Sequence, residues 1–413
     1  MSAERPEQNE PWTHQLCEGL VVLELASVLA GPSVGQFLAE LGARVIKVEN
    51  PATRGDVTRT WKVAGEPDSD RSAYFHSCNW GKESIAVDLK DPRGTDVLHR
   101  LVAASDVVIS NHLPRAARSL KADYESLRAI RPNLIMGSIV GYDPGSDRPG
   151  YDAIIQAEAG YYWINGDPTS EGGHPTKMPV ALMDILAGHQ LKQALLMALL
   201  RRERSGKGSH VTVSLFDAAV SSLTNQATNW LVTGHIPQPM GSEHPNIAPY
   251  GSVFRTADGH SLVLGVGTDR QFGQLCELLE TPALGTDPRF AHNQQRVEHR
   301  VILNERLQVA IGGINRDVLL ERCAAHGIPA GAVRRMDEVF AATPDWLQLP
   351  AGAAGARGVR ETAIWPPAAP EVMASLLAPP AFAADTRSVL SSVVRMDEEA
   401  IGMLLDAGVV VQS

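Results

Sequence analysis

The sequence is short of cysteines, aromatic residues and long apolar runs. Of its 413 residues, four are cysteines and 5% are aromatic. The cysteines lie far apart without a C-x-x-C pair, which argues against a disulfide framework or a structural zinc site and favours a reducing, cytoplasmic compartment. No apolar run approaches the roughly 18 residues of a membrane span, and the polar, acid-containing amino terminus does not resemble a targeting peptide.

The sequence also has fewer basic than acidic residues. Lysine and arginine number 37 against 47 aspartates and glutamates, which gives a formal net charge of −10. Such a chain is a poor candidate for non-specific binding to nucleic acid or to an anionic membrane, and an anionic small molecule would have to find a local cluster of cations. The histidines form no close ligand pair such as H-E-x-x-H, so we expect no metal site.

What the chain does contain is an alternation of short β-branched runs and amphipathic segments. Residues 19–25 and 44–49 have the character of buried strands, and residues 32–41 that of a helix between them. The alternation continues with expected strands at 84–89, 106–110, 133–140 and 209–215 and expected helices at 92–104, 124–130, 153–161, 181–203 and 218–231. This pattern predicts an α/β fold with a Rossmann-like parallel sheet covered on both faces.

The pattern changes after about residue 234. Residues 252–256 and 261–265 flank a turn and predict a β-hairpin, which expected helices at 270–279, 295–311 and 316–326 follow. We therefore expect a large α/β domain over residues 1–233, a smaller α+β domain over 234–344, and a tail over 345–413.

Two familiar motifs near the first strand are incomplete. The loop ASVLAGP at residues 26–32 lacks the G-x-G-x-x-G glycines that let a backbone approach a dinucleotide pyrophosphate. Gly31, Ser33 and Gly35 satisfy G-x-S-x-G, but Ser33 follows the strand by several residues and a proline. That context favours a helix start built from small residues over a hydrolase nucleophile.

Asp184 is a single acid among apolar residues at the start of the expected helix 181–203. One interpretation is a first-turn acid that stabilises the helix. The other is an ionised nucleophile that apolar neighbours make reactive by excluding water, with Gly188 one turn later leaving room for a substrate. The two interpretations are compatible.

Seven segments in register resemble the class III CoA-transferases, the family of formyl-CoA transferase and carnitine CoA-transferase. They are VLELASVLAGP (22–32), LGARVIKVENP (41–51), GDVTRTW (55–61), NWGKESIAVDLKDPRG (79–94), SNHLPRAARSL (110–120), SIVGYDPGSDRPGYDAIIQAEAG (138–160) and PVALMD (179–184). The likeness covers about residues 19–344 and weakens after residue 350.

The resemblance implies a mechanism and a catalytic residue. Asp184 matches the family's nucleophile, which attacks an acyl-CoA thioester, forms a mixed anhydride and then an aspartyl-CoA thioester, and finally accepts the second acid. CoA is then a substrate, and no permanently bound cofactor or metal is required. Backbone amides of a glycine-containing loop such as residues 240–242, which includes Gly241, are expected to hold the oxyanions.

The resemblance also implies the positions that bind CoA and the local cations that an anionic ligand needs. These positions are Ser27, Val28, Ala30, Arg59, Asn79, Lys82, Asn111, Arg115, Arg118 and Tyr142. It further implies an intertwined homodimer whose tail returns to the large domain.

Substrate and reaction type follow from a few positions. The segments RPGYDAIIQAEAG and HPNIAPYGSVF look most like members that act on dicarboxylates, with His244, Arg71 or Arg148 as partners for the second carboxylate. Tyr151 stands where the racemases of the same fold carry a histidine, which favours a transferase. An acyl-CoA racemase and a catalytically silent CoA-binding homologue remain the alternatives.

Overall fold

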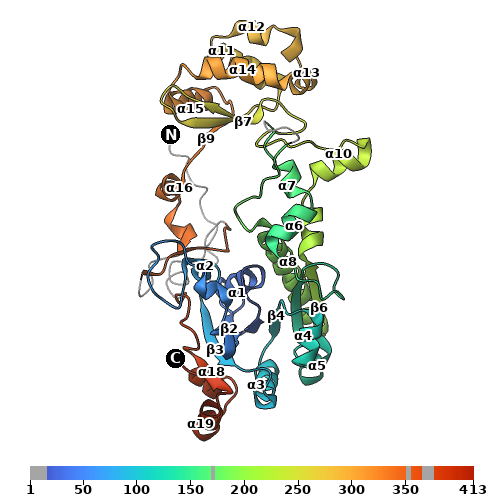
Figure 1. Cartoon of the computed structure of the whole chain (residues 1–413), viewed down its shortest axis with the longest axis vertical. Coiled ribbons are helices and arrows are strands. Elements are labelled where there is room, and N and C mark those ends of the chain that lie inside the picture. Colours follow the sequence, from blue (N-terminus) through green and yellow to red (C-terminus); the bar gives the residue numbers. More distant parts are fainter. Residues whose placement is uncertain (1–15, 169–172, 350–354, 365–375) are drawn as a thin grey trace. The chain divides into compact units, whose positions relative to one another are not determined.

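The computed structural model describes residues 16–168, 173–349, 355–364 and 376–413 (Figure 1). The chain forms two compact units. Unit 1 comprises Met1–Ile155, Val180–Ser222 and Thr343–Ser413, and unit 2 comprises Gln156–Pro179 and Leu223–Ala342. This division differs from the expected boundaries at residues 156–179, which pack with the second unit, whereas the tail is grouped with the first unit.

A seven-stranded sheet forms the centre of unit 1. Its strands are β1 (Val21–Leu25), β2 (Arg44–Glu49), β3 (Lys82–Val87), β4 (Val107–Ser110), β5 (Ile135–Val140), β6 (Ser209–Ser214) and β12 (Val410–Val411). Their order is β12-β3-β2-β1-β4-β5-β6, with β1 to β6 parallel and β12 antiparallel to β3. The sheet confirms the predicted α/β fold. The order reverses between β1 and β4, which is the topological switch point where open α/β sheets bind ligands.

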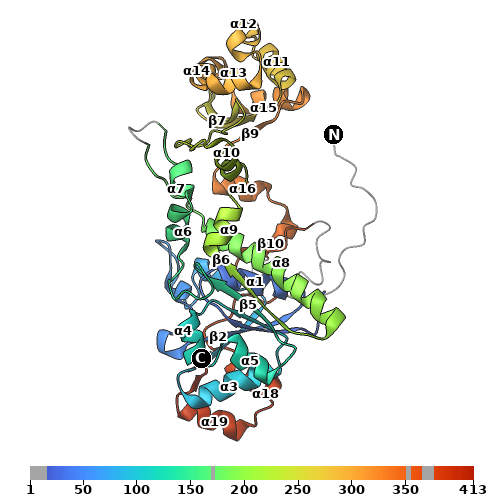
Figure 2. The same ribbon diagram turned by 90° about the vertical axis from the view of Figure 1, so that its right-hand side faces the viewer.

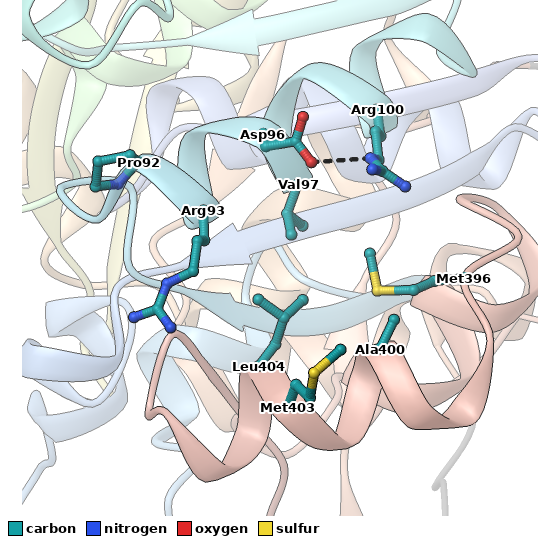
Figure 3. Close-up of a pocket in the computed structure, with 9 residues that line it drawn as sticks. All are labelled: Pro92, Arg93, Asp96, Val97, Arg100, Met396, Ala400, Met403 and Leu404. Carbon is teal, nitrogen blue, oxygen red and sulfur yellow. Dashed lines mark hydrogen bonds and ion pairs between the residues drawn. The ribbon is translucent and has the colours of Figure 1, made fainter.

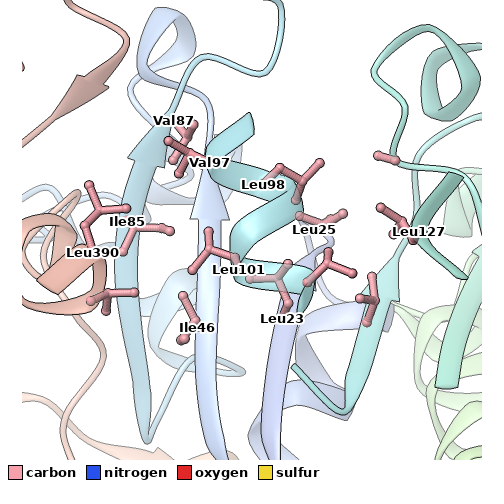
Figure 4. Close-up of a cluster of buried hydrophobic side chains, with 14 of the residues drawn as sticks. Leu23, Leu25, Ile46, Ile85, Val87, Val97, Leu98, Leu101, Leu127 and Leu390 are labelled. Atoms are coloured by element: carbon pink, nitrogen blue, oxygen red, sulfur yellow. The ribbon is translucent and has the colours of Figure 1, made fainter. Parts of the chain in front are cut away.

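Helices cover both faces of this sheet (Figure 2). On one face, α1 (Ala30–Glu40) packs against the strands and against the long helix α8 (Leu182–Ser205). The other face is covered by α3 (Pro92–Ala103), α5 (Tyr124–Ile130) and α18 (Thr386–Ser392). Their apolar side chains meet those of the strands in one buried cluster, which includes Leu23, Ile85 and Leu390 (Figure 4). Burial of this cluster is the main stabilising contribution to unit 1.

The remaining elements of unit 1 are short. They are η1 (Pro51–Thr53), η2 (Val57–Thr60), α2 (Ala73–His76), α4 (Pro114–Ser119), α9 (Leu215–Ser221), η4 (Asp345–Leu347), β10 (Gln348–Leu349), β11 (Gly358–Val359) and α19 (Glu398–Asp406), while α6 (Asp152–Glu158) spans the boundary between the units.

Unit 2 contains an antiparallel sheet of β7 (Tyr250–Arg255), β8 (Ser261–Gly265) and β9 (Ala330–Ala332). The predicted hairpin is β7 and β8. The other elements of unit 2 are α7 (Tyr161–Ile164), α10 (Asn225–Thr233), α11 (Asp269–Leu278), α12 (Pro282–Gly285), η3 (Pro288–Phe290), α13 (Asn293–Glu298), α14 (Arg300–Ile311), α15 (Arg316–Ala325) and α16 (Met336–Ala342). A second buried cluster, separate from that of unit 1, joins this sheet to its helices.

Candidate active site

Asp184 lies in the first turn of α8 and is 9% exposed. The partial positive charge of the helix N-terminus favours the ionised carboxylate there. Its neighbour Met183 donates its backbone N–H to Asp152 Oδ1 at 2.8 Å, so the first residue of α6 caps the start of α8. The structure therefore places Asp184 as a first-turn acid, and the same position suits an ionised nucleophile.

Gly188 lies one turn after Asp184 on the same face of α8. A Cβ atom at this position would lie 2.6 Å from Ser33 Oγ and 3.2 Å from Ala30 O. The expectation that Gly188 leaves room for a substrate is therefore wrong, because the start of α1 occupies that space. The glycine instead lets α8 approach α1 closely, which brings the turn that carries Asp184 toward the first residues of α1.

Ser33 belongs to this helix contact and not to a nucleophile elbow. It lies inside α1, is buried, and its hydroxyl donates to Ala30 O at 2.9 Å. Gly35 faces the buried Glu24 carboxylate, whose Oε2 would lie 1.8 Å from a Cβ at this position. Close packing thus explains the G-x-S-x-G pattern.

Tyr74, on α2, lies close enough to Asp184 for the charge of that carboxylate to act on its phenol. Burial first, and then the carboxylate of Asp184, raises the pKa of Tyr74 to about 12. The phenol is therefore protonated at neutral pH and able to donate a hydrogen bond. Its ring also packs edge-on against Trp61, with ring centroids 5.2 Å apart.

The loop at residues 26–29 connects β1 to α1 at the switch point of the sheet. Asn111, directly after β4, holds this loop by both backbone groups of Ser27. The Ser27 N–H donates to Asn111 Oδ1 at 3.1 Å, and Asn111 Nδ2 donates to Ser27 O at 2.9 Å. The side-chain amide of Asn111 is thus used in hydrogen bonds to the loop. Ser27, Val28 and Leu29 themselves remain partly exposed.

Three of the predicted CoA contacts belong instead to a buried charge network beneath the loop. Lys82 is 1% exposed and donates to Glu24, to Pro32 O and to Asn79 Oδ1, and Asn79 is itself fully buried. Arg59 is 3% exposed and makes two hydrogen bonds of 2.6 and 2.9 Å to Glu49. These cations are paired with carboxylates inside the protein, so we leave them out of the set proposed to contact phosphate.

A cleft of about 110 Å³ opens where β1, β2 and β3 end. Its apolar lining comes from the strands and from two leucines after them, and its polar lining is Glu49, Asn50, Asp88, Lys90 and His112. Among the described residues the buried His112 Nδ1 has no hydrogen-bond partner. Burial lowers the pKa of His112, so the ring is neutral at pH 7 and has a nitrogen to offer to a ligand.

The other predicted positions of unit 1 lie at the same edge of the sheet or nearby. Arg115 and Arg118 are exposed on α4, which follows Asn111. Tyr142 follows β5, and the Arg148 guanidinium carbon lies 3.9 Å from the centre of its ring. Tyr151, directly before α6, is 67% exposed. Arg71 forms an ion pair with Asp70 and donates to Pro379 O, and is therefore engaged with the protein.

Gly241 and His244 lie in unit 2. The Gly241 N–H donates to Gly166 O at 2.9 Å, so this amide is engaged within its own unit. His244 Nδ1 accepts the N–H of Asn246 at 3.1 Å, and burial together with Arg300 lowers the pKa of the ring. At neutral pH His244 can therefore donate a hydrogen bond to a carboxylate but does not supply a positive charge.

A larger groove of about 510 Å³ lies between α3 and α19 (Figure 3). Its floor is apolar, with Val97 and Leu404, and Arg100 at its rim is paired with Asp96. None of the predicted site residues lines it. Within the described ranges no cluster of three or more histidine, cysteine, aspartate or glutamate side chains could hold a metal ion. Among the described helices, none has the length and hydropathy needed to cross a bilayer.

Sequence reasoning missed several groups of this site, namely Tyr74, Asp152, Asp56, Lys47 and His112. Asp152 precedes an expected helix, which is a recognisable capping signal. The others act through contacts between residues far apart in the chain, which local patterns do not show.

Comparisons with known proteins show which proteins this chain is similar to. The family described as CoA-transferase family III matches residues 17–370. A succinate–glutarate CoA-transferase of Agrobacterium fabrum is 42% identical over 330 residues, which cover 78% of this chain and 81% of that protein. The human succinyl-CoA:glutarate CoA-transferase is 34% identical over 409 residues, covering 96% and 90%. A crystal structure of a CAIB/BAIF family protein from Brucella suis superposes with a TM-score of 0.77 at 38% identity, over 91% of this chain and 98% of that one.

Proposed function

Since the chain belongs to CoA-transferase family III, we propose that it moves CoA between a dicarboxylic acyl-CoA thioester and a free dicarboxylate through Asp184. Family membership makes the protein a CoA-transferase. Two relatives, the bacterial and the human enzyme, are named for succinate or succinyl-CoA and glutarate, which supports dicarboxylates as the substrate class.

The proposed reaction splits one exchange into steps on a single carboxylate. An Asp184 oxygen attacks the thioester carbon, the carbon–sulfur bond breaks, and CoA leaves as the thiolate with a mixed anhydride on Asp184. The thiolate then attacks the Asp184 carbonyl carbon, which releases the donor acid and leaves an aspartyl-CoA thioester. The acceptor carboxylate displaces CoA in the same way, and the thiolate attacks the acceptor's acyl carbon, so that a new acyl-CoA forms and Asp184 is regenerated.

The observation that carries this proposal is the position of Asp184. It is nearly buried in the first turn of α8, and the glycine one turn later packs that helix onto the start of α1, directly after the switch-point loop. The helix N-terminus favours the ionised carboxylate, and exclusion of water makes it a better nucleophile. The protonated phenol of Tyr74 is a candidate donor to the oxyanion that forms at the thioester carbonyl.

CoA is proposed to lie along the edge of the sheet at the carboxyl ends of β1 to β4. Its thioester end would meet the side chains of Ser27 and Val28 and the first residue of α1, Ala30. Its nucleotide end would lie beside the small cleft that contains His112 and Lys90, with the exposed Arg115 and Arg118 as partners for phosphate. Gly241 and His244, in unit 2, remain predictions for the oxyanion and for the second carboxylate.

The test is a matched pair of substitutions at the start of α8. Asp184→Asn keeps the shape of the side chain but removes the nucleophile, and we expect transfer between succinyl-CoA and glutarate to fall at least about a thousandfold. Asp152→Asn keeps an oxygen that accepts the Met183 N–H and should retain transfer within about tenfold. Full transfer activity in Asp184→Asn would contradict the mechanism. Exchange of an α-proton without transfer would indicate the racemase alternative.

A further inference from the structure

Val28, in the centre of the switch-point loop, has an unusual backbone conformation. Its φ is +74°, a left-handed value that a β-branched residue rarely adopts. The residues on either side of Val28, Ser27 and Leu29, belong to neither strand β1 nor helix α1. The loop therefore requires other contacts to keep Val28 in this conformation.

Asp56 provides the contact to the Val28 amide. The Val28 N–H donates to the two oxygens of the Asp56 carboxylate at 3.1 and 3.3 Å. Asp56 is 5% exposed and also accepts the N–H and the hydroxyl of Thr58. A charged acceptor in a dry setting makes a strong hydrogen bond to a backbone amide.

Lys47 holds the Asp56 carboxylate from the other side. Its Nζ lies 3.0 Å from Asp56 Oδ2 and 3.0 Å from Glu24 Oε1, and it also donates to Ala26 O at 2.9 Å. This ammonium is 1% exposed. The Lys47–Asp56 pair thus hydrogen-bonds the loop at two points, the carbonyl of residue 26 and the N–H of residue 28. Asn111 hydrogen-bonds both backbone groups of the residue between them.

We propose that Asp56, held by Lys47, is a positioning residue that keeps Val28 in its left-handed conformation and so sets the surface against which acyl-CoA binds. The inference rests on the proposed function, because it assumes that this loop contacts CoA. Without the Asp56 carboxylate, Val28 is expected to relax toward negative φ, and the loop would then present different side chains to the ligand.

The central experiment measures the dissociation constant of CoA by calorimetry for wild type, Asp56→Ala and Asp56→Asn. Loss of a hydrogen bond to a charged group predicts an increase of about ten- to a hundredfold for Asp56→Ala. Asp56→Asn keeps an acceptor oxygen and should show a smaller increase. Equal dissociation constants in wild type and Asp56→Ala would overturn the proposal. Should Asp56→Ala fail to fold, Asp56→Asn carries the same comparison.

A double-mutant cycle separates positioning from general destabilisation. Glycine adopts positive φ without strain, so Val28→Gly should not depend on Asp56 to the same degree. We expect Asp56→Ala to weaken CoA binding by a smaller factor in the Val28→Gly background than in wild type. The same factor in both backgrounds would show that Asp56 acts only through overall stability.

Glu40→Gln is the matched control for burial. Glu40 is 4% exposed at the other end of α1, where it accepts the N–H groups of Glu361 and Thr362. This variant should melt at a lower temperature with an unchanged dissociation constant for CoA. If wild type itself neither binds CoA nor transfers it, the proposed function fails. If wild type binds CoA and Asp56→Ala binds it equally well, only the positioning role fails.

Discussion

At the scale of single residues, the contact between Gly188 and α1 governs how α8 is placed. We expect Gly188→Ala to lower the free energy of unfolding by about 1–3 kcal/mol, since its Cβ would meet Ser33 Oγ at 2.6 Å and Ala30 O at 3.2 Å. Transfer activity should fall as well, because the displaced helix carries Asp184. Denaturant titration and initial rates measure the two effects.

Two further variants check that reasoning. Adding Ser33→Ala to Gly188→Ala removes the closest atom and should restore part of the stability. Gly273→Ala, in α11, would meet no atom within 4 Å and should be neutral or stabilising. Equal losses for Gly188→Ala and Gly273→Ala would contradict a steric cause.

His112 should make stability depend on pH. Burial lowers the pKa of the folded ring below its ordinary value of 6.5, so below about pH 6.5 the unfolded chain binds a proton that the folded chain resists. The free energy of unfolding should therefore fall as pH drops from 7 to 5, by at most about 1.4 kcal/mol per pH unit from this residue. In His112→Phe this contribution disappears, and denaturant titrations at several pH values should show a flatter profile. Parallel profiles for variant and wild type would contradict it.

At the scale of elements, Asp152 links α6 to α8 by capping the Met183 amide. Asp152→Ala should cost about 1 kcal/mol of unfolding free energy, the usual value of an N-cap. Asp152→Asn, which keeps an acceptor oxygen, should cost less, and thermal melting distinguishes the two. Equal losses in the two variants would show that the charge of Asp152, rather than its acceptor oxygen, stabilises the start of α8.

Local patterns predicted most elements because each strand or helix of unit 1 carries its own periodicity. Strand β2 and helix α5 have the predicted bounds. The expected helix 218–231 is two helices, α9 and α10, because Thr224 has a positive φ of 41° between them. The expected helix 295–311 likewise breaks at His299.

Long-range contacts explain what the sequence did not reveal. Strand β12 has two residues and exists only by pairing with β3, more than 300 residues earlier in the sequence. Lys82 looks like a surface cation in its own segment, yet its partner Glu24 lies on another strand and both are buried. Local sequence cannot show such a partner, and for this reason Arg59 and Lys82 resemble free cations available to CoA in the sequence alone.

At the scale of the whole molecule, the homodimer remains a proposal supported by exposed apolar side chains. On α10, Leu231 is 76% and Val232 80% exposed, and on α8, Met197 is 66% exposed. Large apolar side chains that are exposed next to one another, such as Leu231 and Val232, are typical of association surfaces. We expect light scattering to give twice the mass of one chain, and Leu231→Glu with Val232→Glu to shift the protein toward monomer. A wild-type monomer at micromolar concentration would contradict the dimer.

Chemical trapping of the activated Asp184 carbonyl examines the proposed mechanism without relying on any substitution. The protein is incubated with succinyl-CoA, quenched with hydroxylamine and digested, and the peptide that contains Asp184 is analysed by mass spectrometry. We expect a hydroxamate at Asp184 that appears only with the thioester and is absent from Asp184→Asn. A labelled residue elsewhere, or efficient CoA transfer with Asp184 unmodified under these conditions, would contradict it.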